Sequence, residues 1–148
     1  ICSGSKFTFE EKKQIDKLGL SNNIVNLQCC DKELIRLYTH AVAFIYPSKY
    51  EGFGIPILEA WELQCPVLLS NTSCFPEIAN NGSIYFDPNN INSIVSAIKE
   101  IIFDTNKRKE LIDKGNENLK NYSWQKSAKL HQEVYKKVYK DYISNEKY

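Results

Sequence analysis

The sequence predicts an α/β protein built around a doubly wound, parallel, Rossmann-like sheet. Short apolar runs without alternation suit strands that are covered on both faces, as in parallel sheets. The segments between these runs carry apolar residues at three-and-four spacing, which is typical of amphipathic helices. Because the two kinds of segment alternate along the chain, we expect the strands to be parallel.

The helices are marked by their termini. Thr8 and Glu11 have the spacing of a capping box, and Gly19 suits the position just after a helix end. Asp31 and Ser123 are expected N-caps further along the chain. The expected helices cover residues 9–18, 31–38, 55–63, 90–104, 105–120 and 124–142, with a short helical turn at 74–80.

The strands are marked by runs of β-branched, aromatic and other apolar residues. The first residues, ICSGS, look like the end of a buried strand that enters a turn. No internal repeat or linker-like segment divides the chain, so we expect a single domain over residues 1–148. The further expected strands cover residues 24–28, 41–46, 66–70 and 83–87.

Composition excludes several classes of protein. The apolar fraction of 43% and the charged fraction of 25% are ordinary values for a globular domain of 148 residues. A net charge of +1 gives no reason to expect nucleic acid as a partner. No apolar run approaches the roughly 20 residues of a membrane span, and no signal peptide is recognised. The five cysteines lack paired C-x-x-C spacing, which favours reduced thiols in a cytosol-like compartment over a zinc site.

The best candidate site is the stretch PSKYEGFGIPILEAW, residues 47–61. It places Glu51, Gly52, Phe53 and Gly54 after a strand and before a helix, and open parallel sheets bind ligands beyond the carboxyl ends of their strands. Glycines let backbone amides approach a ligand closely. The free N–H groups of a helix start, together with the helix dipole, favour an anion such as a phosphate.

Two glutamates, Glu51 and Glu59, flank this turn. Carboxylates are poor partners for phosphate but bind hydroxyl groups well, as the acidic residue on ribose does in dinucleotide-binding folds. Anion donors between two hydroxyl acceptors would hold a ribose, a diphosphate and a sugar in a row. The residues alone are therefore equally consistent with a nucleotide-sugar site and with a plain strand-to-helix turn that has a capping glutamate and a solvated helix glutamate.

The segment EGFGIPILE resembles the E-x7-E motif of the retaining glycosyltransferases of the GT-B fold, family four, also called group 1. The resemblance continues in order through NIVNL, KELIRLYTHAVAFIYP, PVLLSNTSCFPEI, GSIYFDP and YSWQKSAKLHQEVY, and covers nearly the whole chain. It implies one half of a GT-B fold, the C-terminal donor-binding domain with its final helix. It also implies that the N-terminal acceptor domain and the first strand and helix are absent, so that this chain alone would be inactive.

The resemblance implies a role for each residue of the turn. Glu51, the catalytic candidate, would contact the donor sugar, and Glu59 would bind the ribose hydroxyls. The backbone of the glycine turn would hold sugar hydroxyls and phosphates. Glu77 would face the same cleft or simply occupy a helix start. The implied substrate-binding residues are Ser48, Glu51, Gly52, Phe53, Gly54, Ile55 and Glu59.

By resemblance, the full protein would be a retaining hexosyltransferase of bacterial polysaccharide biosynthesis. It would transfer a sugar from a nucleotide-diphosphate sugar to a glycan or lipid-linked acceptor, which the absent domain would bind, and it would need no metal or other cofactor. We expect it in the cytoplasm. A non-catalytic nucleotide-sugar binding module and a GT-B-like phosphorylase or epimerase remain alternatives.

The chain departs from the family pattern at several positions. Lys6 and Lys49 do not match the basic pair that the family uses for the diphosphate, which would lie upstream of this chain. Cys29 and Cys30 stand in a loop that usually lies against the nucleobase, so the base is not determined. Gln64 replaces a glycine expected after a helix, at a cost of about 1 kcal/mol.

The last expected helix gathers apolar and aromatic side chains on one face, with lysines nearby. This pattern is also found in interfacial helices, so peripheral contact with the inner membrane surface is an alternative. We expect instead that the helix packs on the sheet domain and towards the missing domain. The residues of this face are Trp124, Ala128, His131, Val134, Tyr135, Val138 and Tyr142.

Overall fold

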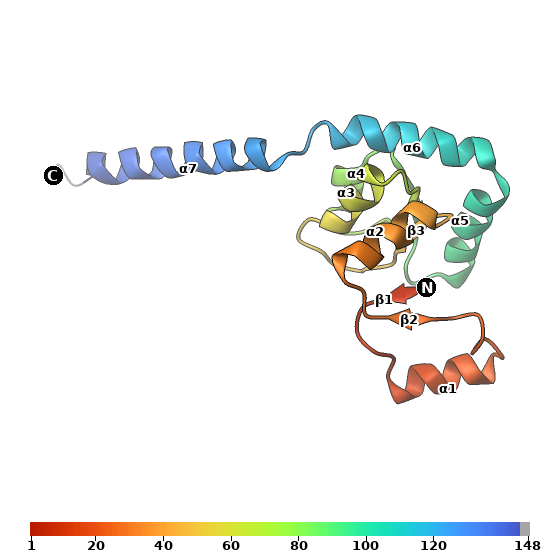
Figure 1. Cartoon of the computed structure of the whole chain (residues 1–148). Coiled ribbons are helices and arrows are strands. Elements are labelled where there is room, and N and C mark those ends of the chain that lie inside the picture. The colour runs from red at the N-terminus through yellow and green to blue at the C-terminus, as the bar shows by residue number, and fades with distance from the viewer. Residues whose placement is uncertain (146–148) are drawn as a thin grey trace. The chain divides into compact units, whose positions relative to one another are not determined.

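The computed structural model describes the backbone of residues 1–145 and the side chains of residues 1–144 (Figure 1). The chain divides into two compact units, Ile1–Ala41 and Val42–Tyr148. Among the described residues each unit contains one small parallel sheet, of two strands in the first unit and three in the second. The predicted α/β class with parallel strands is therefore confirmed.

The first unit alternates strands and helices as expected. The capping box is present, because the Thr8 N–H donates to Glu11 Oε2 over 2.7 Å and the Glu11 N–H donates to Thr8 Oγ1 over 3.2 Å. Gly19 has a left-handed φ of 67°, as expected for a residue after a helix end. The elements are β1 (Cys2–Ser3), α1 (Phe9–Lys17), β2 (Asn26–Leu27) and α2 (Asp31–His40).

Three expectations for this unit are wrong. The N-cap of α2 is Cys30, whose N–H donates to the Glu33 carboxylate over 2.9 Å, so Asp31 lies inside the helix. The strand expected over residues 24–28 is reduced to β2. The residues of β1 are exposed and not buried, since an edge strand in a two-stranded sheet has little to cover it.

The second unit carries the candidate site. Its strands are parallel in the order β3-β4-β5, with Tyr46 opposite Leu69 and Ser70 opposite Phe86. Each expected helix and strand of this part of the chain is found, with ends shifted by a few residues. The elements are β3 (Phe44–Tyr46), α3 (Ile55–Glu62), β4 (Val67–Ser70), α4 (Phe75–Ala79), β5 (Ser83–Phe86), α5 (Ile91–Phe103), α6 (Thr105–Leu119) and α7 (Trp124–Asn145).

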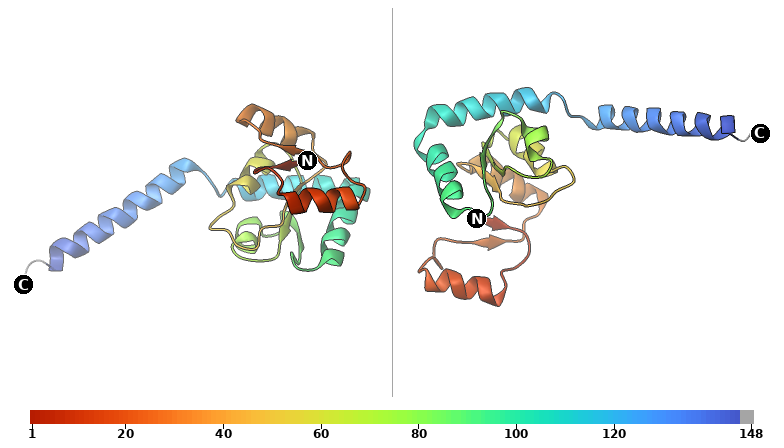
Figure 2. Two further views of the ribbon diagram at one scale, coloured as in Figure 1. Left: turned by 90° about the horizontal axis from the view of Figure 1, so that it is seen from below. Right: turned by 180° about the vertical axis from the view of Figure 1, so that it is seen from behind.

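The core of the second unit forms where β4 and β5 meet α5 and α6. Every residue of β4 is buried, which agrees with its unbroken apolar sequence. Figure 2 shows α6, in cyan, against the rest of this core in both views. The buried cluster contains Leu68, Ile84, Phe86, Ala97, Ile101 and Leu111.

Helix α3, which begins at the candidate site, is held at its other end by close packing on α6. Trp61 of α3 is 1% exposed, and its indole covers Gly115 of α6. A Cβ atom at Gly115 would lie 2.4 Å from Trp61 Cδ1, so only glycine fits there. This contact fixes the position of α3 and hence of the turn at its start.

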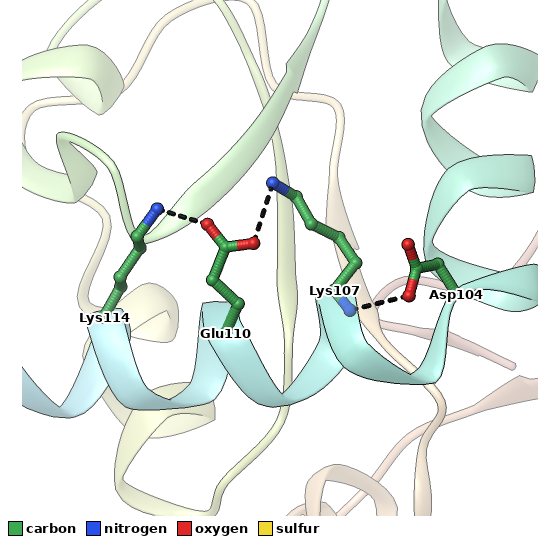
Figure 3. A network of polar contacts seen from close by, with 4 residues as sticks. All are labelled: Asp104, Lys107, Glu110 and Lys114. Carbon is green, nitrogen blue, oxygen red and sulfur yellow. Dashed lines mark hydrogen bonds and ion pairs between the residues drawn. The ribbon is translucent and has the colours of Figure 1, made fainter.

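The exposed face of α6 carries a polar network that serves the helix itself (Figure 3). Asp104 caps the helix by accepting from the Lys107 N–H over 2.9 Å. The Glu110 carboxylate pairs with Lys114 and with Lys107, and the bond to Lys114 is the main reason why the pKa of Glu110 is lowered. Exposed pairs of this kind contribute little to stability.

Helix α7 begins as predicted, because Ser123 Oγ accepts from the Lys126 N–H over 3.1 Å. Its aromatic face is exposed, with Trp124 at 78% and Tyr135 at 69%. The expected packing of this face on the sheet domain is therefore not found in the described residues. Within the described part of the chain, no helix combines the length and apolar character needed to cross a membrane.

Candidate functional site

The candidate site lies where two neighbouring parallel strands end. Residues 47–54 follow β3, and residues 71–74 follow β4, which pairs with β3 in parallel. The carboxyl ends of parallel strands meet at one edge of a sheet, and ligands of open α/β sheets bind there. The position of the glycine turn is therefore the one that the sequence predicted.

Hydrogen bonds from the end of β4 and the loop after it hold the backbone of the first loop. The buried Ser70 hydroxyl donates to the Ser48 carbonyl. Ser73 Oγ accepts from the Glu51 N–H over 3.1 Å and donates to the Glu51 carbonyl over 2.8 Å. The Cys74 thiol lies 3.2 Å from the same carbonyl. The backbone of Ser48 and that of Glu51 are thus each held by residues for which the sequence predicted no role.

Ser73 adopts a backbone conformation that serine rarely accepts. Its φ is 56°, in the left-handed region that favours glycine. Strain of this kind persists only where surrounding contacts enforce it, and here the two bonds to Glu51 do so. Serine carries no sequence signal for this conformation, which is why the residue was missed.

The two glycines of the turn differ in their structural roles. Gly54 is buried, has a φ of 98° and is the N-cap of α3. A Cβ atom there would lie 3.0 Å from the side chains of Ile57 and Phe75, so the fold itself requires glycine. A Cβ atom at Gly52 would meet no other atom within 4 Å. The fold therefore explains Gly54 and leaves Gly52 unexplained.

The backbone amides of the turn are available to a ligand. Within the described residues, no protein acceptor bonds to the N–H groups of Gly52, Phe53, Gly54 or Ile55. Three of these groups precede α3 and the fourth begins it, so they lie at the positive end of the helix dipole. This arrangement can bind an anion, as the sequence predicted.

The carboxylate of Glu51 is half-buried and is bonded to a tyrosine. Tyr46, the last residue of β3, donates its hydroxyl to Glu51 Oε1 over 2.8 Å. Burial, and then the bond to Glu51, raises the pKa of Tyr46 to about 12, so the hydroxyl keeps its proton at neutral pH. Tyr46 carries no sequence signal of this contact, because it looks like an ordinary residue of an apolar strand.

Glu59 lies on α3, just over one turn after Gly54, and is exposed. Among the described residues, no side chain forms a hydrogen bond or ion pair with its carboxylate. Glu51 and Glu59 thus stand before and after the turn, the first already held by a tyrosine and the second open to solvent. Both carboxylates can accept hydroxyl groups.

An aromatic contact joins the turn to the segment before α7. The Phe53 ring meets the Tyr122 ring edge-on, with centroids 5.5 Å apart. The Tyr122 hydroxyl donates to the Ile78 carbonyl over 3.3 Å. Burial raises the pKa of Tyr122, and the charge of the exposed Glu77 adds to this. The charge of Glu77 therefore acts on Tyr122, the residue that contacts Phe53 of the turn. A contact of Glu77 with a ligand stays a prediction.

The described residues contain neither a metal-binding cluster nor a disulfide. Among them, no three His, Cys, Asp or Glu side chains gather in a way that could hold a metal, and all five cysteines are free. A separate pocket of about 190 Å³ lies within the first unit. Its lining includes Lys12 as well as Asp16 and Ser21, which bond to each other. It contains no residue of the glycine turn.

Solved structures share this architecture. A glycosyltransferase from Rickettsia africae superimposes with a TM-score of 0.77 and 25% identity, over 88% of this chain and 36% of that one. The C-terminal domain of a group 1 glycosyl transferase, LpcC, from Francisella tularensis gives a TM-score of 0.66 and 22% identity, over 76% of this chain and 60% of that one. The expected half of a GT-B fold is confirmed.

Curated relatives with assigned activities are also similar. The O-antigen chain mannosyltransferase B of Escherichia coli is 38% identical over 64% of this chain and 25% of its own length. The O-antigen chain mannosyltransferase RfbU of Salmonella typhimurium is 35% identical over 68% of this chain and 29% of its own length. The chain thus spans about a quarter of the length of these enzymes.

The family model described as Glycosyl transferases group 1 matches residues 1–118. This range covers both units up to the end of α6 and includes the whole glycine turn. Because the match extends over well more than half of the chain, the protein belongs to the group 1 family of glycosyl transferases.

Proposed function

We propose that this chain is the donor-binding domain of a retaining hexosyltransferase, and that the domain takes a nucleotide-diphosphate sugar as substrate. The mannosyltransferase relatives make mannose the first candidate for the sugar. The acceptor is a glycan or a lipid-linked sugar of a bacterial surface polysaccharide, bound by a part of the protein outside this chain. The chain alone is expected to bind the donor without transferring the sugar.

The observation that carries this proposal is the set of unpaired backbone amides between two carboxylates. Residues 52–55 offer N–H groups at the start of α3, where a diphosphate is favoured by hydrogen bonds and by the helix dipole. Glu51 and Glu59 offer carboxylate oxygens on either side. These three chemistries match a sugar, a diphosphate and a ribose along one ligand.

The open space at Gly52 supports the same proposal. The surrounding structure would tolerate a Cβ atom there, since none of its atoms lies within 4 Å. Close approach of a ligand to the backbone is a reason for glycine that the fold does not supply. We therefore place the diphosphate or the sugar against this residue.

In the proposed reaction, the bond between the sugar and the diphosphate breaks and the acceptor oxygen attacks the same face of the sugar. The proton of the acceptor hydroxyl passes to the departing diphosphate. The transition state resembles an oxocarbenium ion, and negative charge develops on the leaving diphosphate. The amides of residues 52–55 stabilise part of that charge without moving, because they are already fixed by the turn. Basic groups upstream of this chain would supply the rest, and no metal is needed.

Glu51 contacts the donor sugar in this proposal, and Glu59 binds the ribose hydroxyls. Ser48 acts beside them through its backbone, since its carbonyl accepts from Ser70 and anchors the loop. The two glutamates are thus not an acid and base pair. Each is a hydroxyl acceptor that fixes the orientation of the ligand.

The test is calorimetric titration of the chain with the UDP, GDP, ADP and TDP forms of mannose, glucose and galactose. Binding of at least one of them, at a single site, supports the proposal. Transfer of the bound sugar by the natural full-length protein distinguishes an enzyme from a binding module. Release of a sugar phosphate in the presence of inorganic phosphate would instead favour a phosphorylase, and inversion at a sugar carbon an epimerase.

We also propose a cytoplasmic location, with peripheral membrane contact through α7. Its helical period places Lys126, Lys129, Lys137 and Lys140 on the side opposite its exposed aromatic residues, with Lys136 at the border of the two faces. Such helices lie in the interface of anionic bilayers. Sedimentation with phosphatidylglycerol vesicles tests the contact, which should weaken with added salt and in Lys136→Glu, Lys140→Glu protein.

A further inference from the structure

We propose that Tyr46 is a positioning residue for the donor sugar, because its hydroxyl holds the carboxylate of Glu51 in one orientation. This inference rests on the proposed function, in which Glu51 contacts that sugar. The Tyr46 hydroxyl donates to Glu51 Oε1 over 2.8 Å. Within the described residues it is the only side-chain donor to this carboxylate, so Oε2 remains available to a ligand.

The Tyr46 ring is held by the sheet and by two aromatic neighbours. Its backbone lies in β3, opposite Leu69 of β4. Its ring centroid is 5.1 Å from that of Phe75 and 5.5 Å from that of Phe44, with interplanar angles of 40° and 41°. The oxygen of a hydroxyl on a ring fixed in this way keeps its position, which makes it a suitable anchor for a carboxylate.

A glutamate side chain needs such an anchor if it is to hold a sugar in the orientation that the reaction requires. Its terminal torsion is broad, so a free carboxylate samples many orientations and must be ordered when the ligand binds. A bond to Oε1 orders the group beforehand. Because the pKa of Tyr46 is raised to about 12, the hydroxyl remains a donor throughout the neutral pH range.

The backbone of Glu51 is fixed independently of Tyr46. Ser73 binds both the N–H and the carbonyl of Glu51, and Cys74 lies against the same carbonyl. Loss of the Tyr46 hydroxyl should therefore free the carboxylate and leave the turn and its amides in place. The consequence is a specific one, since contacts to the sugar weaken while contacts to the diphosphate do not.

The test uses the natural protein and the variant Tyr46→Phe, which keeps the ring. Calorimetry measures the affinity for the best nucleotide sugar from the panel and for the matching nucleoside diphosphate, which lacks the sugar. We expect the affinity for the nucleotide sugar to fall about three- to tenfold, as for the loss of one hydrogen bond. The affinity for the nucleoside diphosphate should stay within twofold.

The matched control is Tyr85→Phe. Tyr85 lies on β5 and donates its hydroxyl to the Asn80 carbonyl over 2.7 Å, so the variant also loses one tyrosine hydrogen bond. It should leave both affinities unchanged. A coupling test places Tyr46→Phe in a Glu51→Ala background, where the tyrosine has no carboxylate to hold. The second substitution should then cause no further loss of affinity for the nucleotide sugar.

Three results overturn the inference. Tyr46→Phe could bind the nucleotide sugar like the natural protein, could lose the nucleoside diphosphate to the same extent, or could add its full effect to that of Glu51→Ala. In each case Tyr46 does not act through Glu51, although the proposed function stands if the natural protein binds the donor and Glu51→Ala does not. Absence of binding by the natural protein overturns both proposals.

Discussion

The hydroxyl of Ser73 bonds to both backbone groups of Glu51, accepting from its N–H over 3.1 Å and donating to its carbonyl over 2.8 Å. Residues 22 positions apart in the sequence thereby act as one rigid edge of the sheet. The bonds join the loop after β3 to the loop after β4, and the candidate site depends on them. Loss of these two bonds should therefore affect both the stability of the fold and the site.

Ser73→Ala removes both bonds and keeps the left-handed φ of 56°, which alanine disfavours. We expect unfolding to become easier by about 1–2 kcal/mol, and nucleotide-sugar binding to weaken. Ser73→Gly also loses the bonds but relieves the backbone, so it should be about 1 kcal/mol more stable than Ser73→Ala. Urea denaturation of the two variants measures the difference. Equal stabilities would show that the backbone at this position is not strained.

The two glycines of the turn should respond in opposite ways to alanine. Gly54→Ala meets both a left-handed φ and two side chains at 3.0 Å, and should lower the free energy of unfolding by about 2–3 kcal/mol. Gly52→Ala should change stability by less than about 0.5 kcal/mol. It should nevertheless weaken nucleotide-sugar binding at least tenfold. Thermal denaturation and calorimetry on the same samples separate the two effects, and unimpaired binding by Gly52→Ala contradicts the placement of the ligand.

Gly115 offers a test of how α3 is held. A Cβ atom at this position would lie 2.4 Å from Trp61 Cδ1, and both residues are buried. Gly115→Ala should therefore destabilise the protein by about 3 kcal/mol, although alanine is the better helix former. Chemical denaturation measures this loss. In a Trp61→Phe background, Gly115→Ala should lower the free energy of unfolding by a smaller amount, because the smaller ring leaves more room for the added Cβ atom.

Stability at high pH should depend on the tyrosines at the strand ends. Burial raises the pKa of Tyr46 and that of Tyr85 to about 12 from a value of 10.0 in the unfolded chain. Their contribution to stability is complete below pH 10 and is lost as the pH rises from 10 towards 12, because ionisation then favours the unfolded state. Denaturation midpoints from pH 8 to pH 11.5 should therefore fall less steeply in Tyr46→Phe, Tyr85→Phe protein. A parallel fall in both proteins would contradict this prediction.

The sequence predicted most of the fold because local signals agreed with one another. The capping box at Thr8 and the amphipathic pattern of α5 each predicted a helix and the position where it begins. Gln64 stands where a glycine was expected after α3, and it adopts the left-handed φ of 58° that a glycine would adopt there. Its side-chain amide donates to Asn116 Oδ1 over 2.8 Å. A long-range contact of this kind has no signature in the local sequence.

The candidate site could be located from the sequence but not completed. The position of Glu51 and the glycines at a strand end followed from the order of elements. Tyr46 ends the strand that leads into the turn, but its type is common in any apolar strand. Ser73 and Tyr122 lie far from the turn in the sequence, and only folding brings them to it. The part of all three residues in the site therefore had to come from the structure.

In the proposed function, this turn binds a nucleotide sugar between Glu51 and Glu59. The most direct measurement is the calorimetric affinity of Glu59→Ala for the preferred nucleotide sugar, with Glu62→Ala as the matched exposed glutamate on the same helix α3. We expect Glu59→Ala to lose at least tenfold in affinity for both the nucleotide sugar and the nucleoside diphosphate, since each carries the ribose. Glu62→Ala should bind both ligands as the natural protein does. Equal affinity in the natural protein and in Glu59→Ala would contradict this mode of binding.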